Sequence, residues 1–153
     1  QLLGAVADRI LESVDDVPAS WRDRITGICG CLRDALLSHT DGAELVSASF
    51  AAGQSEAMAH IVTWLADAAA EARVDPSHTE LAARTAVYFV LGFTADEQSR
   101  LQWDAAGAAL PDKQSVLAED PSARFYFGVD LLVNGIGVAE THASVGKFEH
   151  RAR

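Results

Sequence analysis

The sequence predicts an all-α protein, and three observations support this class. Alanine is abundant and runs of β-branched residues are few, which favours helices over strands. Apolar residues recur at three- and four-residue spacing in several separate segments, as in amphipathic helices. The segment from Thr79 to Trp103 contains no proline and is long enough for one long helix. At 153 residues, 49% of them apolar, the chain is expected to form one globular domain over residues 1–153.

The long predicted helix is the element that the other segments must cover. Its middle, from Ala86 to Phe93, is apolar on every side, and such a helix has to be covered on every side. A short strand is the rival interpretation of this stretch, but its length and its polar continuation favour a helix. Gly92 marks a point where another helix or a ligand comes close. Covering this helix requires other helices of the chain or a second copy of it.

Two helices are expected before it in the first quarter of the chain. One covers Gln1 to Ser13, and the next covers Trp21 to Ser38 with Ser20 as its N-cap. The second helix has an apolar stripe with Cys29 beside it: Trp21, Ile25, Ile28, Leu32 and Leu36. Gly27 and Gly30 lie inside this helix, where they indicate either close helix packing or room for a ligand.

The segments on either side of the long helix are less regular. A short helical turn is predicted from Ala43 to Ala48, a loop from Ser49 to Gly53, and a helix from Gln54 to Arg73. A loop is expected from Asp104 to Gln114, and one or two helical turns from Ser115 to Asp120.

The last strong helix is predicted to begin at Pro121 or Ser122 and to end near Glu140. The tail from Thr141 to Arg153 is mostly polar and is expected to fray. Five residues share one face of this helix, with Phe125 leading into it: Gly128, Leu131, Leu132, Gly135 and Val138.

Charge and cysteine content limit the classes of function. The net charge of −10 argues against nucleic-acid binding by this chain alone, because phosphate contact requires a basic face. Cys29 and Cys31 are two residues apart and would point in different directions on a helix, so we expect free thiols and a cytoplasmic protein. The chain starts at Gln1 in a helical pattern without a methionine, which indicates a fragment lacking its N-terminal part.

No catalytic or metal-binding motif stands out. The sequence contains no phosphate-binding glycine loop, no HExxH, no CxxC and no nucleophile elbow, and its histidines are scattered. We therefore expect no enzyme activity, no cofactor and no metal site. Helices with internal glycines and surplus apolar surface favour a small-molecule cavity between helices and a dimer interface made of paired helices.

Three stretches resemble one known family when taken together. They are Leu36–Ala43 (LLSHTDGA), Phe89–Gln98 (FVLGFTADEQ) and Arg124–Gly135 (RFYFGVDLLVNG). Their order and spacing are similar to the C-terminal domain of tetracycline-repressor (TetR) family regulators, in the branch of the tetracycline repressor itself. Trp21 also stands where that branch has a tryptophan. The resemblance covers nearly the whole chain, from Gln1 to about Val138.

This resemblance implies an all-helical domain that senses a ligand and dimerises through a four-helix bundle formed by the long helix and the last helix of two copies. It implies that DNA is bound only through an N-terminal helix-turn-helix domain, which this sequence lacks. The expected dimer interface comprises Phe125, Gly128, Leu131, Leu132, Gly135 and Val138. The expected ligand pocket, from helix faces and family positions, comprises Ile28, Leu32, Val46, Ser49, Phe50, Met58, Val62, Val87 and Tyr88.

The family's magnesium–tetracycline site is only partly retained. Its drug-binding asparagine and phenylalanine correspond to Ile28 and Leu32, and its magnesium-binding histidine corresponds to Val46. The threonine and arginine that follow become Ser49 and Phe50. Only the acidic residue at the far end of the long helix has a counterpart, Asp96, and the segment from Leu110 to Asp120 is short for a pocket lid. These changes imply loss of the metal chemistry and a more apolar effector.

The expected function is therefore effector sensing and dimerisation in a transcriptional repressor, with a small hydrophobic effector and no membrane partner. Two alternatives stay open: a small helical enzyme that uses the same pocket, and a helical bundle that binds another protein. The pocket side chains could also simply fill the core.

Overall fold

The computed structural model describes residues 20–107 and 120–149, with side chains up to Val138, and within these ranges it contains helices and no strand. The all-α prediction is confirmed. The predicted helix at Gln1–Ser13 and the predicted segments within 108–119 lie outside the described residues. The helices are α2 (Trp21–Leu37), α3 (Gly42–Ala51), α4 (Glu56–Glu71), α5 (Thr79–Ala105) and α6 (Pro121–Glu149).

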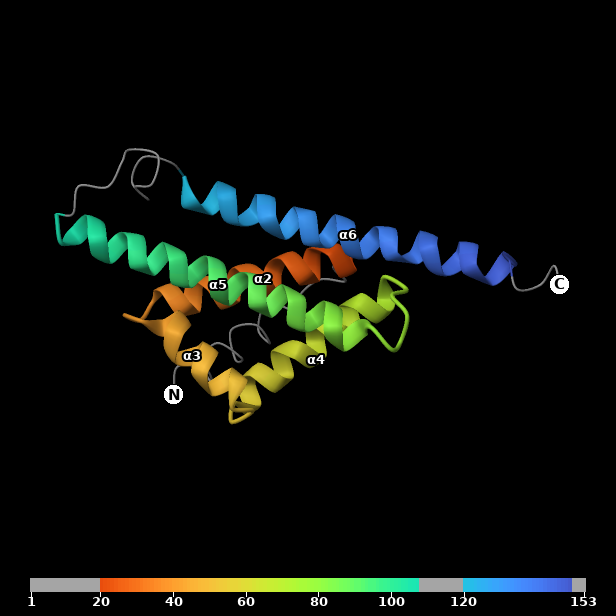
Figure 1. Cartoon of the computed structure of the whole chain (residues 1–153), viewed down its shortest axis with the longest axis horizontal. Coiled ribbons are helices and arrows are strands. Elements are labelled where there is room, and N and C mark those ends of the chain that lie inside the picture. The colour runs from red at the N-terminus through yellow and green to blue at the C-terminus, as the bar shows by residue number, and fades with distance from the viewer. Residues whose placement is uncertain (1–19, 108–119, 150–153) are drawn as a thin grey trace.

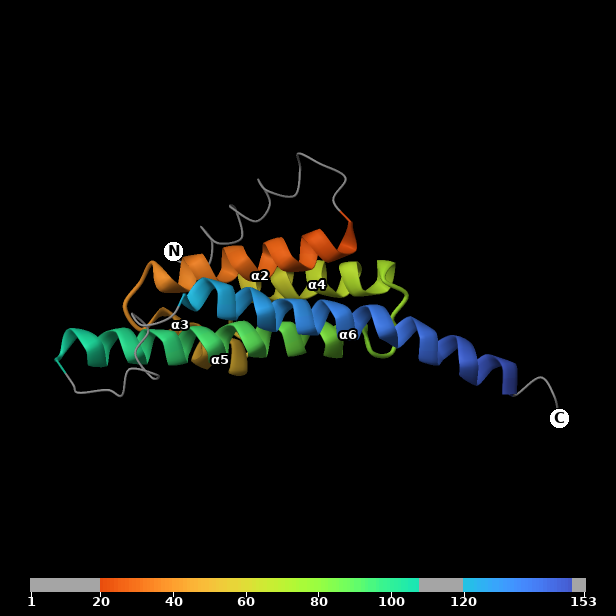
Figure 2. The same ribbon diagram turned by 90° about the horizontal axis from the view of Figure 1, so that it is seen from above.

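Helix α5 is the central element, because it packs against all four other helices. The two longest helices, α5 and α6, run alongside one another in opposite directions, and α3 and α4 lie on the other side of α5 (Figure 1). The view from above shows α2 to one side of the α5–α6 pair, next to α6 (Figure 2).

One side of α5 is nevertheless left uncovered by the other described helices. Val87 and Val90 are fully buried and Leu91 nearly so, as expected for a central helix. A stripe at helical spacing is exposed instead: Leu81, Thr85, Tyr88, Gly92 and Asp96. The prediction that the apolar middle is covered on every side is therefore met only in part within the described chain.

Helix α2 follows its predicted pattern closely. The Ser20 hydroxyl accepts a hydrogen bond from the Asp23 backbone N–H at 3.2 Å and donates one to the Asp23 carboxylate at 2.7 Å, which caps the first turn. The predicted stripe from Ile25 to Leu36 is buried in the core. Gly30 allows close packing, because a Cβ atom there would lie 2.6 Å from the Tyr126 hydroxyl of α6.

Aromatic rings join α5 to α6. Phe125 is fully buried, and its ring centroid lies 5.6 Å from that of Phe89 and 5.4 Å from that of Phe93. Gly128 makes room for this cluster, since a Cβ atom there would lie 2.3 Å from the Phe89 ring. The absence of a side chain at Gly128 thus serves packing between two helices of the same chain.

A buried ion pair ties α2 to α5 and α6. The Arg33 Nε and Nη2 atoms donate to the two Glu97 carboxylate oxygens at 3.0 and 2.8 Å, and both side chains are only 6% exposed. Arg33 Nη1 also donates to the Ser122 hydroxyl at 3.3 Å, and the guanidinium carbon lies 5.1 Å from the centroid of the Phe125 ring. This bidentate geometry satisfies charges that would otherwise be buried without partners.

The next residue of α5 holds the turn between α2 and α3. The Gln98 side-chain amide donates to the carbonyls of Leu36 and His39 at 3.0 and 2.8 Å, and its oxygen accepts from the Ala43 backbone N–H at 3.1 Å. Gly42, the first residue of α3, has no space for a side chain, because a Cβ atom there would lie 2.3 Å from the Leu36 carbonyl oxygen. A single side chain therefore satisfies three backbone groups of this connection.

Two predicted boundaries are wrong. The expected loop over Ser49–Gly53 is largely helical, since α3 continues to Ala51. Phe50 packs against Tyr88 there, and the chain reverses at Gly53, whose φ is +66°. The last helix, predicted to end near Glu140, continues to Glu149, because this stretch contains no proline and only one glycine to interrupt α6.

The predicted free thiols of α2 are confirmed, and they lie in different environments. Cys29 is buried, whereas Cys31 is partly exposed, and neither forms a disulfide. Burial raises the pKa of Cys29 to about 12, because desolvation disfavours the thiolate.

Replacing Arg33 with Met should lower the free energy of unfolding by about 3–5 kcal/mol, because Glu97 would be left buried without its partner. Urea unfolding at fixed protein concentration measures the loss. The double variant R33M/E97M should recover most of it, and R100M, which breaks the more exposed Arg100–Asp96 pair, should cost no more than about 1 kcal/mol. A small effect of R33M would contradict a structural role for the buried pair.

Candidate functional site

Two cavities meet around the C-terminal end of α3, where it faces α4 and α5. The larger, of about 680 Å³, lies between the end of α3, α4 and the start of α5. The smaller, of about 340 Å³, lies between α3 and α5. They share Phe50, Ala51 and Arg84, so these three residues form the partition between them. Both volumes are in the range of small-molecule sites.

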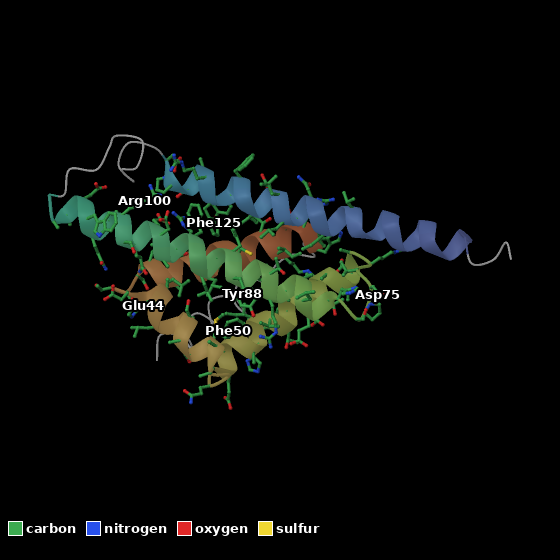
Figure 3. All side chains as sticks on the ribbon, viewed as in Figure 1. Glu44, Phe50, Asp75, Tyr88, Arg100 and Phe125 are labelled. Atoms are coloured by element: carbon green, nitrogen blue, oxygen red, sulfur yellow. The ribbon has the colours of Figure 1, made fainter. Side chains whose placement is uncertain are left out.

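The partition is built from one aromatic ring of α3 and a row of residues on α5. The ring centroids of Phe50 and Tyr88 are 5.9 Å apart in an edge-to-face arrangement, and Figure 3 shows the two side chains reaching toward each other from α3 and α5. The Arg84 guanidinium carbon lies 5.4 Å from the centroid of the Phe50 ring. Glu80, Arg84 and Tyr88 share one side of α5, because they are spaced four residues apart.

Arg84 carries the positive charge at this position. Its Nε donates to a Glu80 carboxylate oxygen at 2.9 Å, and the side chain is 41% exposed. The hydrogen bond to Glu80 raises the pKa of Arg84, and Tyr88 contributes further in the same direction. The guanidinium is therefore charged at all pH values of interest.

The polar character of the two cavities differs. The larger contains two acidic residues, Asp67 and Glu80, together with the hydroxyls of Ser55, Thr63 and Thr79. In the smaller, Arg84 is the one charged residue among the described lining residues, accompanied by the hydroxyls of Ser47 and Tyr88.

A third cavity, of about 620 Å³, lies between the start of α5 and the middle of α6. Its walls on these helices are almost entirely apolar, with Leu81 and Ala86 on α5 and Leu131 and Ile136 on α6. It opens on the side where α5 and α6 expose apolar side chains.

The predicted pocket residues come together between α2, α3, α4 and α5, but some line a cavity and others are buried in the core. Phe50, Val62 and Tyr88 line the cavities just described. Ser49 is half-buried on α3. The other five are almost completely buried in the core cluster: Ile28, Leu32, Val46, Met58 and Val87.

Arg84 is the residue that the sequence interpretation missed. Arg84 follows Glu80 by four residues and precedes Tyr88 by four. In a helix this spacing places all three side chains on one face. That spacing is the available signal, although it does not reveal that Phe50 lies against the same face.

The residues predicted for the dimer interface lie in different environments within the chain. Phe125 is fully buried in its own subunit and offers no surface to a second copy. The Phe89 ring of the same chain fills the space where a side chain at position 128 would lie. Leu132 is half-buried against the core, whereas three residues remain on the outer face: Leu131, Gly135 and Val138.

Neither a metal site nor a membrane span is found in the described parts of the chain. No group of His, Cys, Asp or Glu side chains there could hold a metal ion, and Asp96 pairs with Arg100 at 2.8 Å. Among the described helices, none has the length and apolar character needed to cross a bilayer.

A protein-family comparison identifies the class. The family model described as the tetracycline-repressor-like C-terminal domain matches residues 15–139. The chain belongs to this family of transcriptional regulators, which are not enzymes, and the resemblance inferred from its three stretches is confirmed.

Particular solved structures agree with this assignment. BioQ from Mycobacterium smegmatis is 53% identical, with a TM-score of 0.74 over 90% of this chain and 72% of that chain. BioQ with its natural double-stranded DNA operator is 50% identical, with a TM-score of 0.67 over 88% and 70%. A possible TetR family regulator from Streptomyces coelicolor A3(2), 24% identical with a TM-score of 0.67 over 88% and 72%, supports the fold alone. No curated protein matches significantly.

Magnesium-dependent tetracycline binding should be absent or weak in this chain. The resemblance implies that Val46 stands at the position of the family's magnesium-binding histidine, and its aliphatic side chain, only 2% exposed, supplies no ligand to a metal. Calorimetric titration with tetracycline, with and without Mg²⁺, should show no metal-dependent heat. V46H alone should not restore binding, because Ile28 and Phe50 still lack the polar groups. Tight binding that requires Mg²⁺ would contradict this interpretation.

Proposed function

We propose that this chain is the effector-sensing and dimerisation domain of a cytoplasmic TetR-family repressor. Its effector is a small, largely apolar molecule that binds between α3, α4 and α5. DNA contact belongs to a helix-turn-helix domain that precedes this one in the regulator. The observation that carries the proposal is the pair of cavities around Phe50, in a chain whose family consists of transcriptional regulators.

DNA binding is assigned to another part of the regulator on the basis of charge and relatives. BioQ, which is 50% identical to this chain, has been solved with its DNA operator. The chain itself has a net charge of −10, which repels phosphate groups. A regulator that binds DNA with this domain attached therefore needs a separate basic surface.

The contacts of α5 offer a route from the cavities to α2. A ligand between α3 and α5 would contact both of these helices. Gln98 of α5 is hydrogen-bonded to Ala43 of α3 and to Leu36 of α2. The Arg33–Glu97 ion pair connects α5 to α2. In this proposal the ligand favours one arrangement of α2 and α5 because it binds that arrangement more tightly. The spacing of two DNA-binding heads, about 34 Å apart on successive major grooves, would change in consequence.

The uncovered side of α5 and α6 supports dimerisation through these helices. Leu131 and Val138 on α6 are 60% and 54% exposed, and Leu81 at the start of α5 is exposed beside the same apolar cavity. Large apolar side chains clustered in this way are typical of protein interfaces. A second copy placed across the pair would form a four-helix bundle with two-fold symmetry, burying upward of roughly 2,000 Å².

A charge placed on this surface should break the dimer. We expect L131R to convert the protein to a folded monomer, because two buried arginines would face each other across the symmetry axis. Light scattering measures the oligomeric state, and circular dichroism confirms that helices remain. L45R is a matched control, because Leu45 is 65% exposed on α3. A wild-type monomer at micromolar concentration would refute the assembly.

The chain of residues 1–153 should not bind duplex DNA measurably at physiological salt, because its net charge of −10 supplies no basic face. The same chain fused to a TetR-family helix-turn-helix domain with its operator should bind. Fluorescence anisotropy with both proteins and one labelled duplex makes the comparison. Sequence-specific binding by residues 1–153 alone would show that the domain assignment is wrong.

A further inference from the structure

The smaller cavity, between α3 and α5, has a composition that neither of the others shares. Its described lining consists of one arginine, two hydroxyl-bearing residues and four apolar residues or glycine: Ser47, Phe50, Ala51, Arg84, Tyr88, Leu91 and Gly92. The larger cavity beside it holds Asp67 and Glu80 as well as Arg84. A negatively charged ligand would therefore be repelled in the larger cavity and attracted in the smaller one.

Arg84 is positioned to bind such a ligand. The planar guanidinium has five N–H donors, more than Glu80 and Tyr88 accept. The guanidinium carbon lies over the Phe50 ring, 5.4 Å from its centroid, and this cation–π contact helps to hold the guanidinium in place. Glu80 is 67% exposed and its pair with Arg84 is an ordinary surface contact, so a ligand carboxylate can replace it with little loss.

The remaining walls suit an apolar body attached to that carboxylate. Phe50 and Tyr88 meet edge to face at 5.9 Å, which provides aromatic surface beside the guanidinium. Leu91 is almost fully buried and forms an aliphatic wall. The volume of about 340 Å³ is near the lower end of small-molecule sites, which favours a compact molecule over a long chain.

We propose that the cavity between α3 and α5 binds a compact carboxylic acid with an aromatic or branched apolar body, its carboxylate paired with Arg84. The Tyr88 and Ser47 hydroxyls lie in the same wall and supply further donors. The assignment rests on the proposed role of the domain in sensing an effector. It adds an anionic group to that effector, whereas the apolar positions predicted from the sequence implied a small hydrophobic molecule.

Phenylacetate and its neutral analogue phenylacetamide test this assignment, because they share the aromatic body and differ in charge. Calorimetric titration of the whole chain should show millimolar-range binding of phenylacetate and weaker binding of phenylacetamide. R84Q should weaken phenylacetate binding by about tenfold and leave phenylacetamide binding little changed, since a charge-assisted hydrogen bond is lost.

Two further variants separate the site from general charge effects. E80Q should tighten phenylacetate binding, because Glu80 no longer competes for the guanidinium. R100Q is the matched control on the same helix, since Arg100 forms the same four-residue pair with Asp96, outside this cavity. It should leave both affinities unchanged.

The outcomes distinguish this assignment from the function on which it rests. Equal binding of the two compounds, or equal loss in R84Q and R100Q, would overturn the carboxylate assignment while the cavity remains a ligand site. Absence of binding by both compounds would overturn the site. Neither result would bear on dimerisation or on DNA binding by the fused protein, which are measured separately.

Discussion

The fold depends on two adjacent polar residues of α5 that are buried where an apolar helix would be expected to place apolar side chains. Glu97 holds Arg33 of α2 in a bidentate pair, and Gln98 satisfies the backbone of the turn between α2 and α3. Hydrogen bonds have directional requirements that apolar contacts lack. They therefore define how α2 crosses α5, and they place α3, with Phe50 near its end, against the same side of α5.

This arrangement explains what the three family-like stretches of the sequence do in the fold. The stretch from Leu36 to Ala43 is the turn that Gln98 binds, and the stretch from Phe89 to Gln98 carries both the aromatic ring and the polar pair. The stretch from Arg124 to Gly135 supplies Phe125, which completes the aromatic cluster. Three segments far apart in sequence thus meet around one helix, so their residue types reflect packing in the described chain as much as ligand binding.

Much of the fold could be predicted from the sequence, and the candidate site much less. Helical spacing located α2 and α4 because each buries one regular stripe, as Ile25 to Leu36 show, whereas the length of α5 without a proline located that helix. The length of α3 was not predicted, because its last turn is stabilised by the packing of Phe50 against Tyr88, which is distant in the sequence. Arg84 was not predicted as a site residue for the same reason, since Phe50, which it contacts, is distant in the sequence. A helix face alone does not say which neighbour covers it, so the sequence did not show that Phe125 and Gly128 pack against Phe89 of the same chain.

Tyr88 belongs both to the wall of the smaller cavity and to the exposed stripe of α5. Any second copy that approaches this stripe, and any ligand that enters this cavity, would share that side chain. Thermodynamic linkage then requires reciprocity: if association of two copies changes the ligand's affinity by some factor, the ligand changes the association constant correspondingly. Apparent ligand affinity would depend on protein concentration, so the cellular abundance of such a regulator would help to determine how much ligand it responds to.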